Sequence, residues 1–396
     1  MIFNELTYYL LFLFPSVAVF HVLGATHLRR KKILQSWTLA AFGMLFFVWF
    51  AHKHFGGRVG ILAIAIFIWE LAFSRLYRPG SRACLLGVLQ AILLLVALKY
   101  SLFLSHVVTD ATGIRMGVPQ FIVPLGLSFF TFEFIHFAVD SYMGAITPVP
   151  LSRYAAFIFF FPTMVAGPIK RFQEFNHELD SARFQPELMA RGITRILTGL
   201  AKKHVLADTF MMWSDRLNTL EALTAKPAKL LMWLLAYSMQ IYFDFSGYSD
   251  IAIGSGYLFG IHVPENFNWP YLSRSISDFW RRWHISLGRW IFDYVYKPLG
   301  GSRMGKVRTL VNLFLAFLVS GLWHGAAYHF LVWGAWHGAM MIVHRLWKQW
   351  QGRPQGKAAT VVGTLLTFLG VVVGWGFFSM NLHRACFVLG RIFGLL

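Results

Sequence analysis

The chain has 396 residues, of which 57% are hydrophobic and 13% charged, and its formal net charge is +19. Soluble domains carry roughly a quarter charged residues, so this chain has too few charges to cover a water-facing surface. Its basic residues gather in short clusters, as in the cytoplasmic loops of membrane proteins, and no nucleic-acid-binding motif accompanies them. The composition therefore predicts a single membrane-embedded domain over residues 1–396 and excludes nucleic acid as a partner.

Apolar stretches close to the length that spans a hydrocarbon core recur along the whole chain. They are Leu6–Leu23, Trp37–Phe50, Val59–Phe73, Cys84–Leu104, Phe121–Tyr142, Tyr154–Val165, Leu230–Phe245, Thr309–Leu322, Tyr328–Val343 and Ala359–Phe378. The sequence therefore predicts an all-α polytopic membrane protein with roughly 10–12 transmembrane helices.

Basic clusters between the spans predict the orientation of the chain. Met1–Glu5 contains no Lys or Arg, whereas Arg29–Lys32 follows the first span and Arg75–Arg82 follows the third. Both clusters then lie in the cytoplasm and the N-terminus is extracytoplasmic. The two cysteines, Cys84 and Cys386, lie in or beside apolar segments, so neither a disulfide nor a cysteine metal site is expected.

The apolar pattern first breaks in the middle of the chain. Pro162–Arg171 reads as a span that breaks at Gly167-Pro168, and Gln173–Leu188 reads as a loop with a surface helix. Farther on, Asp244 stands at the end of an apolar run, where an unpaired carboxylate is costly. Two interpretations of Asp244 follow: it caps or pairs locally to fix a helix end, or it lines a substrate cavity.

The segment Ser275–Leu299 is rich in Trp, Arg and His, and we expect a helix over it, capped by Ser275 or Ser277. Helical spacing places Trp280, Trp283, His284 and Leu287 on one face and Arg282, Ser286 and Arg289 on another. This helix is too charged to face lipid. It lies either in the membrane interface or as a re-entrant segment that lines a cavity.

A second polar segment, Val319–Gly338, breaks between two apolar stretches at Trp323-His324. Gly321 and Gly325 flank this histidine and leave room for close approach by a substrate or another helix. His337 is expected to be a packing residue, because that is what a lone histidine on an apolar face most often is.

The two polar segments contain the types of side chain that acyl transfer requires, although their spacing alone leaves other chemistry open. Histidine can take the proton of an attacking hydroxyl, and indole N–H, Arg or a second His can stabilise the oxyanion. The candidates are His324, His284, Trp280, Arg281, Arg282 and Trp323. The sequence contains no nucleophile elbow, HExxH motif or P-loop that would indicate another enzyme class.

Ordered motifs make the chain resemble the membrane-bound O-acyltransferase family, in the branch of alginate O-acetyltransferases and D-alanyl transfer proteins. The motifs are VPLGLSFFTF at 123–132, FP at 161–162, VAGPI at 165–169, GLAKK at 199–203, YFDFSGYSD at 242–250, PENF at 264–267, DFWRRWHISL at 278–287, PLGGSR at 298–303 and GLWHG at 321–325. Residues 120–345 thus read as the catalytic core, 1–110 as N-terminal scaffold spans and 358–396 as C-terminal spans.

The resemblance implies a ring of helices around a central channel, with His324 as the catalytic residue and His284 as a second functional position. The side chains expected to line the substrate channel are Trp280, Arg281, Arg282, Trp283, Trp323, Asp244 and Asn266. No bound cofactor or metal is expected.

The resemblance also implies where the acyl group comes from and where it goes. The donor is acetyl-CoA or an acyl carrier protein on the cytoplasmic side of a bacterial plasma (inner) membrane. The acceptor is an extracytoplasmic partner protein or a cell-envelope polysaccharide. Transfer of acetyl is favoured, D-alanyl transfer toward teichoic acid is the alternative, and a channel or transporter without chemistry is the alternative from another class.

Overall fold

The computed structural model describes residues 5–55, 57–115, 117–119, 123–124, 126–165, 167–351 and 356–396. Within these ranges the chain forms helices and connecting segments, with one isolated β-bridge between Phe267 and Trp283. The all-α prediction is confirmed. The chain divides into two compact units, Met1–Gly199 with Tyr248–Pro264, and Leu200–Gly247 with Glu265–Leu396.

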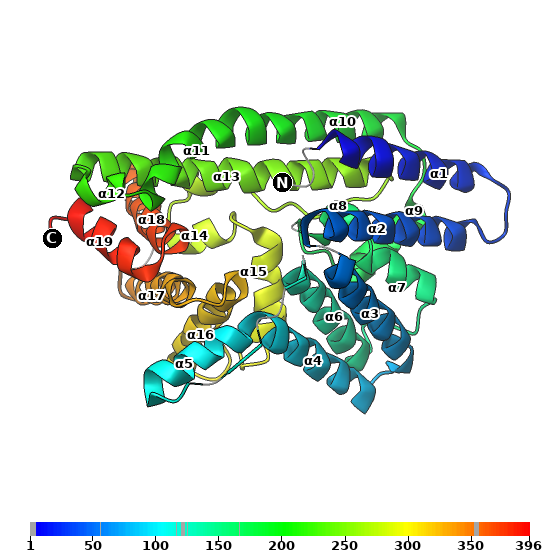
Figure 1. The fold of residues 1–396 in the computed structure, drawn as a ribbon, viewed down its shortest axis with the longest axis horizontal. Coiled ribbons are helices and arrows are strands. Elements are labelled where there is room, and N and C mark those ends of the chain that lie inside the picture. The colour runs from blue at the N-terminus through cyan, green and yellow to red at the C-terminus, as the bar shows by residue number, and fades with distance from the viewer. Residues whose placement is uncertain are drawn as a thin grey trace. The chain divides into compact units, whose positions relative to one another are not determined.

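The first unit holds the N-terminal helices (Figure 1). They are η2 (Tyr8–Leu13), α1 (Phe14–Ala25), α2 (Lys31–Phe55), α3 (Gly57–Phe73), η3 (Ser74–Leu76), α4 (Arg82–Leu95), η4 (Val96–Tyr100), α5 (Ser101–Thr112), α6 (Leu127–Tyr142), α7 (Leu151–Ile158), α8 (Phe161–Met164), α9 (Phe172–Ser181) and most of α10 (Pro186–Ala201). The end of α13 packs here too, where the Tyr8 hydroxyl donates to Ser255 at 3.1 Å.

The second unit holds the C-terminal helices and the polar segments singled out above. They are η5 (Lys202–Ala207), α11 (Asp208–Ser214), η6 (Asp215–Asn218), α12 (Glu221–Thr224), most of α13 (Pro227–Leu258), η7 (Pro270–Leu272), α14 (Ile276–Trp280), α15 (Ile285–Ile291), η8 (Phe292–Tyr296), α16 (Lys306–His324), α17 (Tyr328–Gln351), α18 (Lys357–Ser379) and α19 (Leu382–Ile392). Its core is built on four buried tryptophans, Trp233, Trp283, Trp333 and Trp375.

Among the described residues, five helices are long and apolar enough to cross a membrane. They are Tyr8–Ala25, Lys31–His54, Arg82–Thr112, Lys306–His324 and Lys357–Ser379. The chain is a multi-pass membrane protein, as predicted. The ring arrangement and the larger number of spans stay predictions, as does the orientation, because Met1 to Asn4 lie outside the described residues.

One expected span is wrong. Tyr154–Val165 is not a single helix, because α7 ends at Ile158 and α8 runs only over Phe161–Met164. Pro162 explains the break: proline has no N–H and fits the first turn of a new helix rather than the interior of an old one. The expected break at Gly167-Pro168 falls between α8 and α9, and Ala166 beside it lies outside the described residues. A surface helix within Gln173–Leu188 is confirmed by α9.

Close contact between α16 and α17 depends on glycine. A Cβ atom on Gly321 would lie 2.3 Å from the backbone oxygen of Phe330, and one on Gly325 would lie 2.0 Å from the Phe330 ring. The space beside His324 that the sequence predicted is therefore taken by a helix. Figure 1 shows the two helices side by side below α14.

We expect Gly321→Ala to destabilise the protein by about 1–3 kcal/mol, because the added methyl group meets backbone that cannot move aside. The measurement is the thermal unfolding midpoint of the purified full chain in detergent. Gly117→Ala is the matched control, since a Cβ at Gly117 meets nothing within 4 Å. Equal midpoints for the two variants would contradict the close approach.

Candidate functional site

The Trp- and Arg-rich segment is broken rather than continuous. Ser275 caps α14 by accepting a hydrogen bond from the Asp278 N–H at 3.2 Å, as predicted. The helix then ends at Trp280, and α15 begins only at Ile285. The expectation of one helix with two faces is therefore wrong. The four residues between the two helices form a turn that ends at His284.

His284 has φ 44° and ψ 53°, a left-handed conformation that costs a non-glycine residue about 1–2 kcal/mol. Hydrogen bonds on both sides hold the turn in place. The Asn268 N–H donates to the Arg282 carbonyl at 3.0 Å, and the Ile285 N–H donates to the Asn266 carbonyl at 3.0 Å. The strain is thus imposed by the loop that pairs with this turn.

The side chain of Asn266, in addition to its backbone carbonyl, stabilises the turn. It is fully buried, and its Oδ1 accepts from the Ser286 hydroxyl at 2.6 Å and from the Ser286 N–H at 3.3 Å. Sequence reasoning expected Asn266 to line the substrate channel. The contacts that the structure gives it are with the start of α15, and a contact with substrate stays a prediction.

Asp278 binds both arginines of the turn. Its carboxylate accepts from Arg282 Nε at 3.1 Å and from Arg281 Nη2 at 3.3 Å. Burial raises the pKa of Asp278, but the hydrogen bonds from Arg282, the Arg274 backbone and Arg281 outweigh it and hold the pKa below its usual value. The carboxylate therefore stays charged at neutral pH and fixes the turn electrostatically.

Asp244 lies inside α13, fourteen residues before its end, so it does not fix a helix end as one interpretation proposed. It is paired locally, however, since Lys203 Nζ lies 2.6 Å from its Oδ1. Lys203 also reaches Asp208 at 3.0 Å. Local pairing is therefore what the structure shows for Asp244, and its role as a channel-lining residue stays a prediction.

His324 is the last residue of α16 and is only half-buried, whereas His284 is 2% exposed. The centroids of the two imidazole rings are 6.4 Å apart. Trp323 lies beside both, 5.9 Å from His284 and 4.8 Å from His324. The two histidines from segments forty residues apart therefore meet at one place, as the family resemblance implied.

Aromatic rings enclose the two histidines. Phe245 meets His284 edge-on at 4.6 Å, while Trp333 and Phe378 meet His324 edge-on at 5.1 and 5.0 Å. We call these five residues the histidine cage. They come from α13, the turn before α15, and α16, α17 and α18, so the cage exists only when these elements pack together.

A third imidazole adjoins the cage. His337, fully buried on α17, lies 4.9 Å from Trp333 and 5.0 Å from Trp280. A Cβ on Gly374 of α18 would come within 2.5 Å of its Nε2. Sequence reasoning expected packing for His337 and did not select Trp333. Their spacing of four along one helix was the available signal, since it places them on one face.

Six buried nitrogens in and beside the histidine cage have no hydrogen-bond partner among the described residues. They are both ring nitrogens of His284, both ring nitrogens of His337, and the indole Nε1 atoms of Trp280 and Trp333. A buried polar group without a partner costs about 1–3 kcal/mol, so such groups are rarely left together without reason. Water or a bound polar group that accepts and donates hydrogen bonds would remove this cost.

An apolar cavity adjoins Trp280 on α14. Its volume is about 610 Å³, and α14, α15, η8 and α16 contribute its walls. Arg281, whose side chain is 71% exposed, and Arg289 line it together with Phe317 and Ser320. An apolar cavity with a few cationic and hydroxyl groups suits a long, partly anionic molecule.

Comparison with known proteins gives consistent matches. The family model described as the membrane-bound O-acyltransferase family matches residues 93–386. The probable alginate O-acetylase AlgI of Pseudomonas syringae pv. tomato is 36% identical over 413 residues, covering 97% of this chain and 73% of that protein. The matched regions extend beyond residues 120–345, which the motifs alone had indicated.

Two further relatives carry other names. The peptidoglycan O-acetyltransferase of Helicobacter pylori is 33% identical, covering 78% of this chain and 64% of that protein. The teichoic acid D-alanyltransferase of Bacillus subtilis is 31% identical, covering 81% of this chain and 85% of that protein.

We expect Asn266→Ala to lower stability by about 1–3 kcal/mol, because the buried hydroxyl and N–H of Ser286 lose a shared acceptor. The measurement is again the thermal unfolding midpoint of the full chain. Asn268→Ala is the matched control: this side chain is exposed, and the hydrogen bond from Asn268 to the turn uses its backbone. A midpoint unchanged in Asn266→Ala would contradict the role given to this side chain.

Proposed function

Since the chain belongs to the membrane-bound O-acyltransferase family, we propose that it moves a short acyl group, acetyl first, from a cytoplasmic thioester to an extracytoplasmic cell-envelope polysaccharide. The chain is a multi-pass membrane acyltransferase. The proposal of acetyl draws on the identity of 36% to an alginate O-acetylase and of 33% to a peptidoglycan O-acetyltransferase. We place the protein in the bacterial plasma membrane with its N-terminus outside, from the distribution of basic clusters.

The observation that carries this proposal is the group of unpartnered nitrogens around a half-buried histidine. The carbonyl oxygen of an acyl group would accept hydrogen bonds from these nitrogens, and the hydroxyl group of the molecule to be acylated would both accept and donate them. In the chemistry we propose, His324 accepts the proton of the acceptor hydroxyl as its oxygen attacks the thioester carbonyl. The indole N–H groups of Trp280 and Trp333 are then positioned to donate to the developing oxyanion.

The remaining steps balance the reaction. The tetrahedral intermediate collapses, the carbon–sulfur bond breaks, and the proton held by His324 passes to the sulfur of the leaving thiolate. The products are the acylated acceptor and the free thiol. His284, 6.4 Å from His324 across the cage, is proposed to bind the hydroxyl or the carbonyl rather than to exchange the proton itself.

The donor in this proposal is acetyl-CoA or an acyl carrier protein. The cavity beside Trp280 supports either, because its apolar walls suit an acyl-pantetheine arm and Arg281 and Arg289 suit the phosphate that both donors carry. A channel or transporter without chemistry gains no support, since the relatives named above are acyltransferases.

D-alanyl transfer is the second candidate, because the chain is also 31% identical to a teichoic acid D-alanyltransferase. The donor separates the two candidates. Purified full chain in nanodiscs is offered radiolabelled acetyl-CoA or a D-alanyl-loaded carrier protein, and release of free thiol is followed. Turnover of the carrier thioester alone would replace acetyl with D-alanyl in the proposal.

We expect His324→Ala to lower acyl transfer by about 10²–10⁴-fold, the usual contribution of a general base. Mass spectrometry of the envelope glycan, with and without the variant, measures the loss in cells. His383→Ala is the matched control, because this histidine is exposed on α19. Near-normal glycan acylation by a well-expressed His324→Ala chain would remove His324 from the mechanism.

We expect Trp333→Phe to lower kcat by about 10²-fold with little change in KM, because only the oxyanion donor of the cage is lost. Thioester turnover by purified protein measures both constants. Trp350→Phe on the same helix is the control, since Trp350 is 75% exposed. A purely structural role would instead lower the unfolding midpoint and leave kcat of the folded fraction unchanged.

A further inference from the structure

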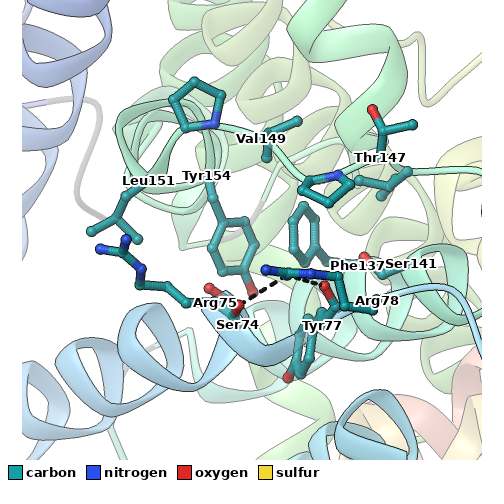
Figure 2. Close-up of a pocket in the computed structure, with 13 residues that line it drawn as sticks. Ser74, Arg75, Tyr77, Arg78, Phe137, Ser141, Thr147, Val149, Leu151 and Tyr154 are labelled. Atoms are coloured by element: carbon teal, nitrogen blue, oxygen red, sulfur yellow. Dashed lines mark hydrogen bonds between the residues drawn. The ribbon is translucent and has the colours of Figure 1, made fainter. Parts of the chain in front are cut away.

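A second pocket lies within the first unit. Its volume is about 240 Å³, and it opens between η3 with the segment that follows it, the end of α6 and the start of α7. Figure 2 shows the side chain of Arg78 beside the ring of Tyr154 and the side chain of Arg75 extending toward Leu151, with Tyr77 and Ser141 nearby. No catalytic or substrate role has been given to these residues.

The pocket is positively charged. Among its thirteen lining residues, all within the described part of the chain, two are arginines and none is acidic. One nitrogen of Arg78, Nη1, donates to the carbonyls of Arg75 and Tyr77 at 3.0 and 2.7 Å. These bonds orient the guanidinium at the pocket and leave its other N–H groups for a ligand.

The carboxylate that contacts the pocket wall, Glu70, is buried behind two of the lining tyrosines. Glu70 is 2% exposed, and its oxygens accept from Tyr154 at 2.9 Å, from Tyr77 at 3.2 Å and from Gln90 at 2.9 Å. Two of these donors line the pocket with their rings and turn their hydroxyls toward Glu70. The acid thus fixes the pocket wall without cancelling the charge of the arginines in it.

Neutral donors complete an anion site. Ser141, only 4% exposed, lines the pocket, and so do Pro150 and Leu151 at the start of α7. A helix start presents unpaired N–H groups and partial positive charge, and α7 has no side-chain cap there. Two arginines, a hydroxyl and a helix start together match the oxygens of a phosphate.

We propose that this pocket binds a phosphate group, and that its source in the membrane is the headgroup of an anionic phospholipid. Basic pockets between helices on the cytoplasmic side are typical sites for such headgroups. The pocket lies at the Arg75–Arg82 cluster, which the charge pattern places in the cytoplasm. Leu76 and Met143 beside it are 58% and 73% exposed, as expected for side chains that meet lipid.

The test compares Arg75→Gln with wild type in the full-length protein. We expect the wild-type protein to retain phosphatidylglycerol in native mass spectrometry. We expect the affinity of Arg75→Gln for this lipid to be at least about tenfold lower, because a hydrogen bond to a charged group is lost. Phosphatidylcholine is the lipid control, since its cationic choline opposes two arginines. Inorganic phosphate against chloride, read by the unfolding midpoint, distinguishes a free anion from a lipid headgroup as the source.

Arg82→Gln is the matched control variant, because Arg82 is exposed in the same cluster but does not line the pocket. Binding of either phosphate source that depends on Arg75 but not on Arg82 supports the proposal. Equal binding to wild type and Arg75→Gln, or equal losses in both variants, overturns it. Thioester turnover by Arg75→Gln is measured alongside, and unchanged turnover separates this site from the acyl-transfer chemistry.

Discussion

The hydrogen bonds between Asn266 and the first residues of α15 hold the chain in a conformation that it would otherwise leave. His284 is left-handed, and its backbone relaxes unless Ile285 and Ser286 remain bound to Asn266. Because the turn is fixed, the imidazole of His284 faces Phe245 and His324. Three hydrogen bonds to Asn266 thus hold α14 and α15 apart as a broken segment rather than one continuous helix.

Packing around the histidine cage follows from this turn. Trp280 ends α14 against Trp333 and His337, while Trp283 packs on Trp375 at 4.8 Å. The indole N–H of Trp375 has a hydrogen-bond partner, since Nε1 donates to the Tyr271 hydroxyl at 3.1 Å. The indole N–H groups of Trp280 and Trp333 have no partner among the described residues. Indoles with and without a hydrogen-bond partner therefore lie side by side in one core. This contrast is consistent with the role as oxyanion donors that we propose for Trp280 and Trp333.

The sequence was sufficient for the fold class, because hydropathy is a local signal, whereas the proximity of His284 and His324 followed only from the family resemblance. It was insufficient where contacts distant in the chain decide conformation. The turn at residues 281–284 depends on residues 266–268, so helical periodicity predicted an unbroken helix. His337 was expected to be a packing residue and Trp333 was not selected, because the surroundings of their ring nitrogens are set only once α14, α17 and α18 have packed. Gly321 and Gly325 signalled close approach, but not by which neighbour.

His324 closes α16, a helix of 19 residues that ends at this imidazole. The carbonyl groups of the last turn point past it and give the helix end a partial negative charge equal to about half an elementary charge. An imidazolium at such an end is favoured by about 0.3–1 kcal/mol, and by up to about 2 kcal/mol when partly buried. If His324 accepts the proton as proposed, the backbone of α16 stabilises the imidazolium that forms.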